Sequence, residues 1–136
     1  MNQSRKATLR QLAGSAWGVM LFLTLSAGQV HAHVVLDSPN GGEMLEAGSV
    51  AQIVWHDAVN HGPATYDLWY SISGPEGPWM VIDSGLERSG AQRTTYDWVV
   101  PDTPSDQVRL RVLQDNSEAQ DYTDISDADL GFGVVL

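Results

Sequence analysis

The histidines are the residues of this sequence whose positions best suit chemistry. There are four, His31, His33, His56 and His61, and there is no cysteine, which excludes thiol catalysis, thiolate metal sites and type-one copper centres. A cut after Ala32 would make His33 the first residue, with two nitrogen donors, its α-amine and its imidazole. With a second imidazole these donors form a three-nitrogen set that suits Cu(II), which binds nitrogen tightly in tetragonal geometry.

The cut is predicted by the first 32 residues, which have the three parts of a secretory signal peptide. A start with three basic residues and no acid is followed by an apolar run over 16–27, and 30–32 (VHA) ends the segment with small residues. The apolar run is shorter than the roughly 20 residues that a membrane-spanning helix needs. We therefore expect export to the periplasm or the extracellular space, with a signal peptide over 1–32, one domain over 33–136 and no membrane span after cleavage.

Two residues are candidates for the second imidazole. His56 directly follows the strand predicted over 49–55, and His61 lies in the polar loop after it. We prefer His61, because a residue in the middle of a loop can turn toward the terminus, whereas His56 is tied to a strand end. In an antiparallel sandwich the first strand starts near the end of the second, so all three histidines are expected at one pole. The alternative is that they are ordinary polar loop residues.

Alternation of apolar and polar residues, not helical periodicity, dominates the chain after residue 32. Turn signals such as SPNGG at 38–42 and GPEGP at 74–78 separate the alternating segments. The predicted strands are 33–37, 49–55, 66–72, 79–83, 94–100, 107–113 and 131–136. About seven strands in roughly 100 residues describe an all-β domain, an antiparallel β-sandwich of immunoglobulin or fibronectin type, with Trp55 and Trp98 in its core.

Several segments resemble an Ig-like domain of bacterial secreted proteins. They are SPNGGE at 38–43 with Gly48 and IVW at 53–55, then YDWVVP at 96–101, the segment 108–112, and DISD at 124–127. That domain is similar to the N-terminal Ig-like domain of fungal Ser/Thr-rich anchored proteins involved in cell-wall β-glucan assembly. The resemblance implies the fold and leaves the function open. The predicted terminal His33 resembles the histidine brace of lytic polysaccharide monooxygenases and related copper proteins.

The net charge of the chain limits the classes of molecule that it is expected to bind. The 17 acidic residues against four arginines leave the chain after residue 32 with a net charge of −13. Such a surface repels nucleic acid and anionic lipid and attracts cations or basic partners. We expect a copper ion or a copper-handling protein as the partner, and no nucleic acid. The acidic segment 115–129 is a weaker candidate, for Ca²⁺, because it lacks the glycine that an EF-hand loop requires.

Three hypotheses follow. The first is an exported copper-binding protein for storage, delivery or scavenging, with His33, His61 and His56 as the metal residues. The second is a metal-free Ig-like adhesion or carbohydrate-binding module for cell-surface polysaccharide, with Trp69 or Trp79 as a sugar-stacking platform. The third is a copper monooxygenase-like enzyme, ranked last because about 100 residues leave little room for a broad substrate surface. Neither G-x-S-x-G nor H-E-x-x-H is present, so no catalytic residue is assigned.

Overall fold

The computed structural model of the chain describes residues 33–60 and 62–134. The predicted signal peptide, His61 and residues 135–136 lie outside the described residues. Within the described ranges the secondary structure consists of strands, and no helix is long and apolar enough to cross a bilayer. The strands are β1 (Val34–Ser38), β2 (Met44–Glu46), β3 (Val50–Asp57), β4 (Ala64–Ser71), β5 (Met80–Glu87), β6 (Thr94–Val99), β7 (Ser105–Asn116), β8 (Tyr122–Ile125) and β9 (Leu130–Gly133).

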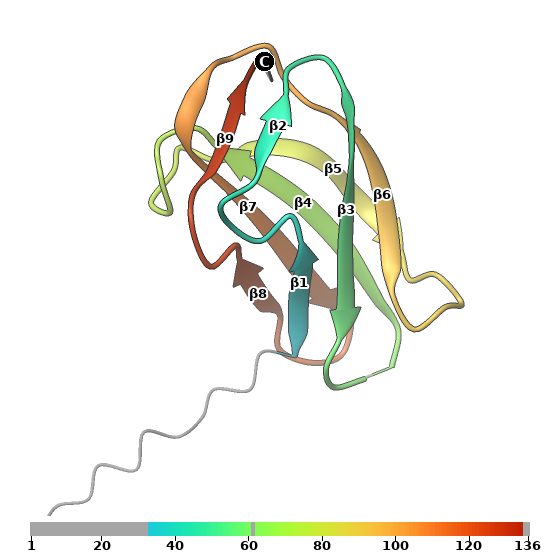
Figure 1. The fold of residues 1–136 in the computed structure, drawn as a ribbon. Coiled ribbons are helices and arrows are strands. Elements are labelled where there is room, and N and C mark those ends of the chain that lie inside the picture. The colour runs from blue at the N-terminus through green and yellow to red at the C-terminus, as the bar shows by residue number, and fades with distance from the viewer. Residues whose placement is uncertain (1–32, 61, 135–136) are drawn as a thin grey trace, which may run out of the picture.

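The strands form two sheets that face each other across the core (Figure 1). The smaller sheet has the order β1-β3-β6, and the larger has the order β2-β9-β7-β4-β5, with β8 also paired to β7. The pairs are antiparallel except for β2 with β9, which is parallel. The immunoglobulin/fibronectin-like β-sandwich predicted from the sequence is confirmed.

Two short strands correct the predicted strand pattern. β2 has only three residues, which is too short for its alternation to be recognised in the sequence. β8 lies in the acidic segment predicted as a loop, where it pairs with β7 through the register Arg111↔Ile125 to Gln114↔Tyr122. Both strands exist because a longer neighbour offers backbone hydrogen bonds, which local sequence does not reveal.

The core consists of the inward side chains of both sheets. Trp55 is 1% exposed and Trp98 is 6% exposed, so both tryptophans assigned to the core are buried there. On β7 the buried Val108, Leu110 and Val112 alternate with half-buried residues, as predicted. Each large apolar side chain buried in this way stabilises the fold by about 1.5–3 kcal/mol.

Two segments that carry the Ig-like resemblance contact each other. The Asn40 side chain donates Nδ2–H to Asp127 Oδ2 at 2.8 Å and accepts the Asp127 N–H at 3.0 Å. The Glu43 carboxylate accepts the N–H groups of Asn40 (3.3 Å) and Gly41 (2.9 Å). A Cβ on Gly41 would lie 2.7 Å from the Ala128 Cβ, so glycine is required for this approach. The resembling segments therefore serve the fold by joining the β1–β2 turn to the segment after β8.

β1 positions the candidate site because it contacts both sheets. It pairs with β3 through Val34↔Asp57 and Val35↔His56. Its outer edge faces β8, where the Leu36 N–H donates to Asp124 Oδ2 at 2.7 Å. The start of β1, the end of β3 and β8 consequently meet at one pole of the sandwich (Figure 1).

Candidate functional site

His33 is held at the start of β1 by backbone and ring contacts. Its carbonyl oxygen accepts the N–H groups of Ala58 (2.9 Å) and Val59 (3.4 Å), which follow β3. Its imidazole lies against Tyr122 of β8, with ring centroids 3.8 Å apart and planes inclined at 57°. The predicted first residue of the mature chain therefore contacts both the segment after β3 and β8.

His56 lies near the end of β3 with its side chain 28% exposed. Its Nδ1 lies 2.8 Å from Asp37 Oδ2, and Arg93 Nε donates to the same oxygen at 3.1 Å. When Nδ1 carries the proton, this hydrogen bond fixes the ring and leaves the lone pair of Nε2 for a metal or another donor. The Asp37–His56 pair has the arrangement that carboxylates make with metal-binding imidazoles.

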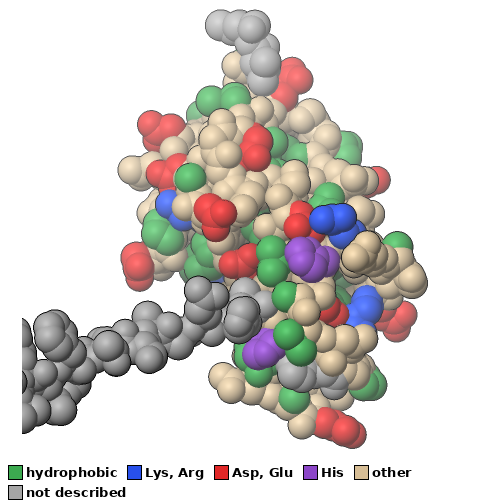
Figure 2. Space-filling view, turned by 60° about the horizontal axis from the view of Figure 1, so that its bottom comes forward, with side chains coloured by type: hydrophobic (Ala, Val, Ile, Leu, Met, Phe, Trp, Pro, Cys, Tyr) green, Lys and Arg blue, Asp and Glu red, His purple; other side chains and the backbone are tan. Residues whose placement is uncertain are grey.

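The structure places His33 and His56 at the same pole without bringing their rings together. Val35 faces His56 in the register, and His33 lies two residues before Val35, just ahead of the start of β1. One ring contacts Tyr122 and the other contacts Asp37. The histidine side chains accordingly do not form one patch in Figure 2. Among residues 33–60 and 62–134, no three His, Asp or Glu side chains are grouped so that they could hold a metal ion; His61 lies outside these ranges.

A partly buried polar network lies beside His56 and was not identified from the sequence. The Tyr66 hydroxyl donates to the Asp57 carboxylate, whose two oxygens lie 2.6 and 2.7 Å away, and Arg88 forms an ion pair with Asp57. Burial raises the pKa of Tyr66 to about 12, and the hydrogen bond to Asp57 adds to this rise. The three residues come from β3, from β4 and from the position directly after β5, so no local motif reveals their contact.

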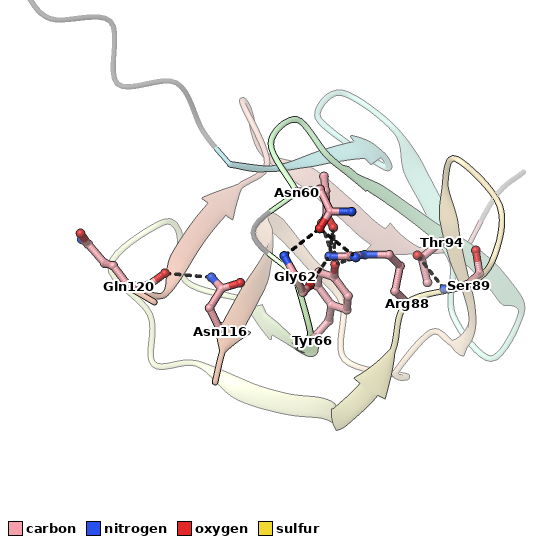
Figure 3. A network of polar contacts seen from close by, with 9 residues as sticks. Asn60, Gly62, Tyr66, Arg88, Ser89, Thr94, Asn116 and Gln120 are labelled. Carbon is pink, nitrogen blue, oxygen red and sulfur yellow. Dashed lines mark hydrogen bonds and ion pairs between the residues drawn. The ribbon is translucent and has the colours of Figure 1, made fainter. Parts of the chain in front are cut away.

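Arg88 also organises the β3–β4 loop (Figure 3). It donates to Asn60 Oδ1 at 3.2 Å and to the Gly62 carbonyl at 3.3 Å, and the Gly62 N–H donates to Asn60 Oδ1 at 2.9 Å. The residues on both sides of position 61 are therefore tied to β5. A hollow of about 180 Å³ opens beside this loop, with His56, Arg88 and Thr94 among its lining residues.

A larger hollow of about 440 Å³ lies at the start of β4. Thr65, Glu87 and Asp115 are among its lining residues, and these three are cross-strand neighbours in the register. None of the described residues that line it is a histidine, so it offers oxygen donors only. The smaller hollow contains the His56 imidazole, which the contact with Asp37 orients.

The acidic segment 115–129 uses several carboxylates as structural acceptors. Asp124 accepts the Leu36 N–H, Asp121 accepts the Asn116 N–H at 2.9 Å, and Asp129 is paired with Arg109 at 2.6 Å. These acids face different partners and are not gathered around one point.

Trp69 and Trp79, the predicted sugar platforms, lie on the larger sheet and are half-buried. The guanidinium carbon of Arg111 lies 4.9 Å from the ring centre of Trp69 and 4.5 Å from that of Trp79. The two rings are therefore not bare platforms, because a cation covers part of each.

Comparison with known proteins gives one likeness of fold that supports the architecture. No protein-family model matches the chain, and no curated protein matches it in sequence. An AA10 lytic polysaccharide monooxygenase from Streptomyces lividans aligns with a TM-score of 0.51 and 7% identity, over 66% of this chain and 58% of that one. Fibronectin(III)-like modules of Clostridium thermocellum CbhA align with a TM-score of 0.47 and 15% identity, over 76% of this chain and 98% of theirs. The chain thus spans less than two thirds of the monooxygenase, and the likeness is one of fold.

Proposed function

We propose that this is an exported protein that binds Cu(II) through its mature N-terminus, for storage, delivery or scavenging. The observation that carries the proposal is the position of His33, the predicted first residue after cleavage, which is anchored to Ala58 and Val59 and packed on Tyr122. A free α-amine at this residue would close a chelate ring with the imidazole, which supplies two of the three nitrogens. Anchoring before the metal arrives lowers the entropic cost of ordering the site.

Either His56 or His61 would supply the third nitrogen. His56 has the better-defined environment, because a hydrogen bond from its Nδ1–H to Asp37 would hold the ring and leave Nε2 available. His61 lies outside the described residues, between Asn60 and Gly62, which both accept hydrogen bonds from Arg88. The position in the loop keeps His61 as our first choice, and separate alanine variants decide between the two.

Charge and fold are compatible with this role. A net charge of −13 after residue 32 raises the local concentration of cations. The likeness to a lytic polysaccharide monooxygenase would suit a copper enzyme too, but the chain covers only 58% of that protein, and we propose binding in place of oxidation. Export to the periplasm or the extracellular space is proposed from the signal-peptide pattern of residues 1–32.

The test compares the mature protein with a variant that carries one extra residue before His33. The mature protein should bind one Cu(II) and give a tetragonal, nitrogen-rich electron paramagnetic resonance spectrum. The extension converts the amine into an amide, a far poorer donor, so affinity should fall sharply. Affinity should also decline below about pH 6, where protons compete for imidazole.

Two alanine variants complete the test. His61→Ala should weaken binding more than His56→Ala if His61 is the ligand, and the reverse order assigns His56. Equal copper affinity with and without the extra residue would reject the proposal. A metal-free module would be indifferent to all of these changes.

A further inference from the structure

Arg111 differs from the other arginines of the described chain. Arg88, Arg93 and Arg109 are each paired with an aspartate. Arg111 forms no ion pair and donates no side-chain hydrogen bond within the part of the chain that the structure describes, although the sequence contains 17 acidic residues. Its charged group contacts aromatic rings instead.

Register explains how the aromatic contacts arise. Arg111 on β7 faces Trp69 on β4, and Trp69 faces the 53% exposed Val81 on β5. Trp79 precedes β5 and has the same parity as Val81, so these four side chains share the outer face of the larger sheet. The indole rings hold the guanidinium in place by cation–π attraction, and its N–H groups make no hydrogen bond to the residues that the structure describes.

Arg111 keeps its charge in this setting. Burial against the rings lowers its pKa, but a guanidinium loses its proton only far above neutral pH. A fixed, planar cation with unused N–H donors is the usual protein partner of a carboxylate, which it can bind through two parallel hydrogen bonds. Holding the group in place beforehand reduces the entropy lost on binding.

We propose that the Trp69–Arg111–Trp79 surface binds a polysaccharide that carries carboxylates, such as a chain of uronic acid residues. The guanidinium would pair with the carboxylate, while indole and Val81 surfaces would pack against the apolar faces of the sugar rings. Trp69, Arg111 and Trp79 do not line either hollow described above. A ligand bound to them would lie along the outer face of the larger sheet, which suits an extended chain. The site is separate from the proposed copper site.

The test uses the mature protein without metal, at about 0.15 M salt, where a Debye length of about 8 Å limits repulsion from distant acids. Trigalacturonate is titrated while the indole N–H signals are followed by nuclear magnetic resonance. Trp69 and Trp79 should shift, whereas the buried Trp55 and Trp98 serve as internal controls and should not. Maltotriose, which lacks carboxylates, should bind at least about tenfold more weakly.

Matched variants test the role of the guanidinium. Arg111→Gln should weaken trigalacturonate binding by about tenfold or more, and Arg111→Lys should also weaken it, because lysine keeps the charge but loses the planar fork. Arg93→Gln removes the same charge from an exposed position on the other side of the fold and should have no effect. Thermal melting of each variant confirms that it is folded, and Trp79→Phe, which keeps an aromatic ring, should retain part of the affinity.

Three outcomes would overturn the proposal. One is the absence of shifts at Trp69 and Trp79. Another is equal weakening by Arg93→Gln, which would indicate unspecific attraction. The third is equally tight binding of a poly-glutamate peptide, which would assign the surface to acidic peptides. None of these outcomes depends on copper, so the two proposals succeed or fail separately.

Discussion

The Tyr66 hydroxyl lies where the core meets the candidate site. The residue is fully buried, so its O–H needs an acceptor inside the protein, and Asp57 supplies one with both carboxylate oxygens. Arg88 balances the resulting charge and extends the network into the β3–β4 loop. Through Asp57 and Arg88, the buried Tyr66 is therefore connected to the β3–β4 loop, which also contacts His33.

The raised pKa of Tyr66 predicts a loss of stability at high pH. The folded-state pKa of about 12 exceeds the ordinary value of 10, so this group's contribution is fully present below pH 10 and disappears as the pH rises through about 12. We expect the free energy of unfolding, measured by urea denaturation, to fall across this range. Tyr66→Phe should make the fall shallower, and an identical slope in both proteins would contradict this explanation.

Gly41 allows a second test at the residue scale. Its φ of 146° and the 2.7 Å approach to Ala128 leave no room for a side chain. Gly41→Ala should lower the free energy of unfolding by about 2 kcal/mol or more, as measured by chemical denaturation. Gly90→Ala is the control, because a Cβ there meets nothing within 4 Å, and it should change stability by less than about 0.5 kcal/mol. An equal loss of stability in both variants would show that the lost backbone freedom of glycine, and not the contact with Ala128, causes the effect.

At the scale of elements, we expect the hydrogen bonds of Arg88 to hold the β3–β4 loop in place. Arg88→Met leaves Asp57, which is 9% exposed, without its charge partner and should cost about 2–4 kcal/mol of stability. Arg93→Met breaks a more exposed pair, with an arginine side chain 59% exposed, and should cost less than about 1 kcal/mol.

Hydrogen exchange gives an independent measurement of the same role. The Ala58 amide, bonded to the His33 carbonyl, should exchange faster in Arg88→Met and remain protected in Arg93→Met. Unchanged protection in both variants would show that the loop is held by other contacts.

Strands with clear alternation were predictable from the sequence, and those that depend on neighbours were not. The alternation on β3 and β7 follows from side chains facing a core on one side only. β2 and β8 form on partners distant in sequence, such as Gly131–Gly133 for β2. In the candidate site, the shared pole of His33 and His56 follows from strand direction alone. The Asp57–Tyr66–Arg88 contact and the cover of Arg111 over Trp69 depend on side-chain reach, which the sequence does not contain.

At the scale of the whole molecule, acidic side chains spread over the surface set the electrostatics (Figure 2). A net charge of −13 after residue 32 implies self-repulsion that opposes folding. We expect the melting temperature of the mature domain to rise between about 10 and 150 mM NaCl, as the Debye length shortens from about 30 to 8 Å. Calorimetry measures this directly, and a falling melting temperature would mean that surface ion pairs outweigh the repulsion.

The parallel pairing of β2 with β9 has a consequence for the order of folding. It joins Met44–Glu46 to Gly131–Gly133, so two segments almost ninety residues apart complete one edge of the sandwich together. A chain that crosses a membrane starting from its N-terminus would present β1 and β2 long before β9 arrives. This edge of the sandwich would therefore form only after β9, the last strand, is available. Folding would be slow, because segments distant in the sequence must meet first. Until then the open edge of β2 would be exposed to pairing with wrong partners, and a chaperone would best protect this part of the emerging domain.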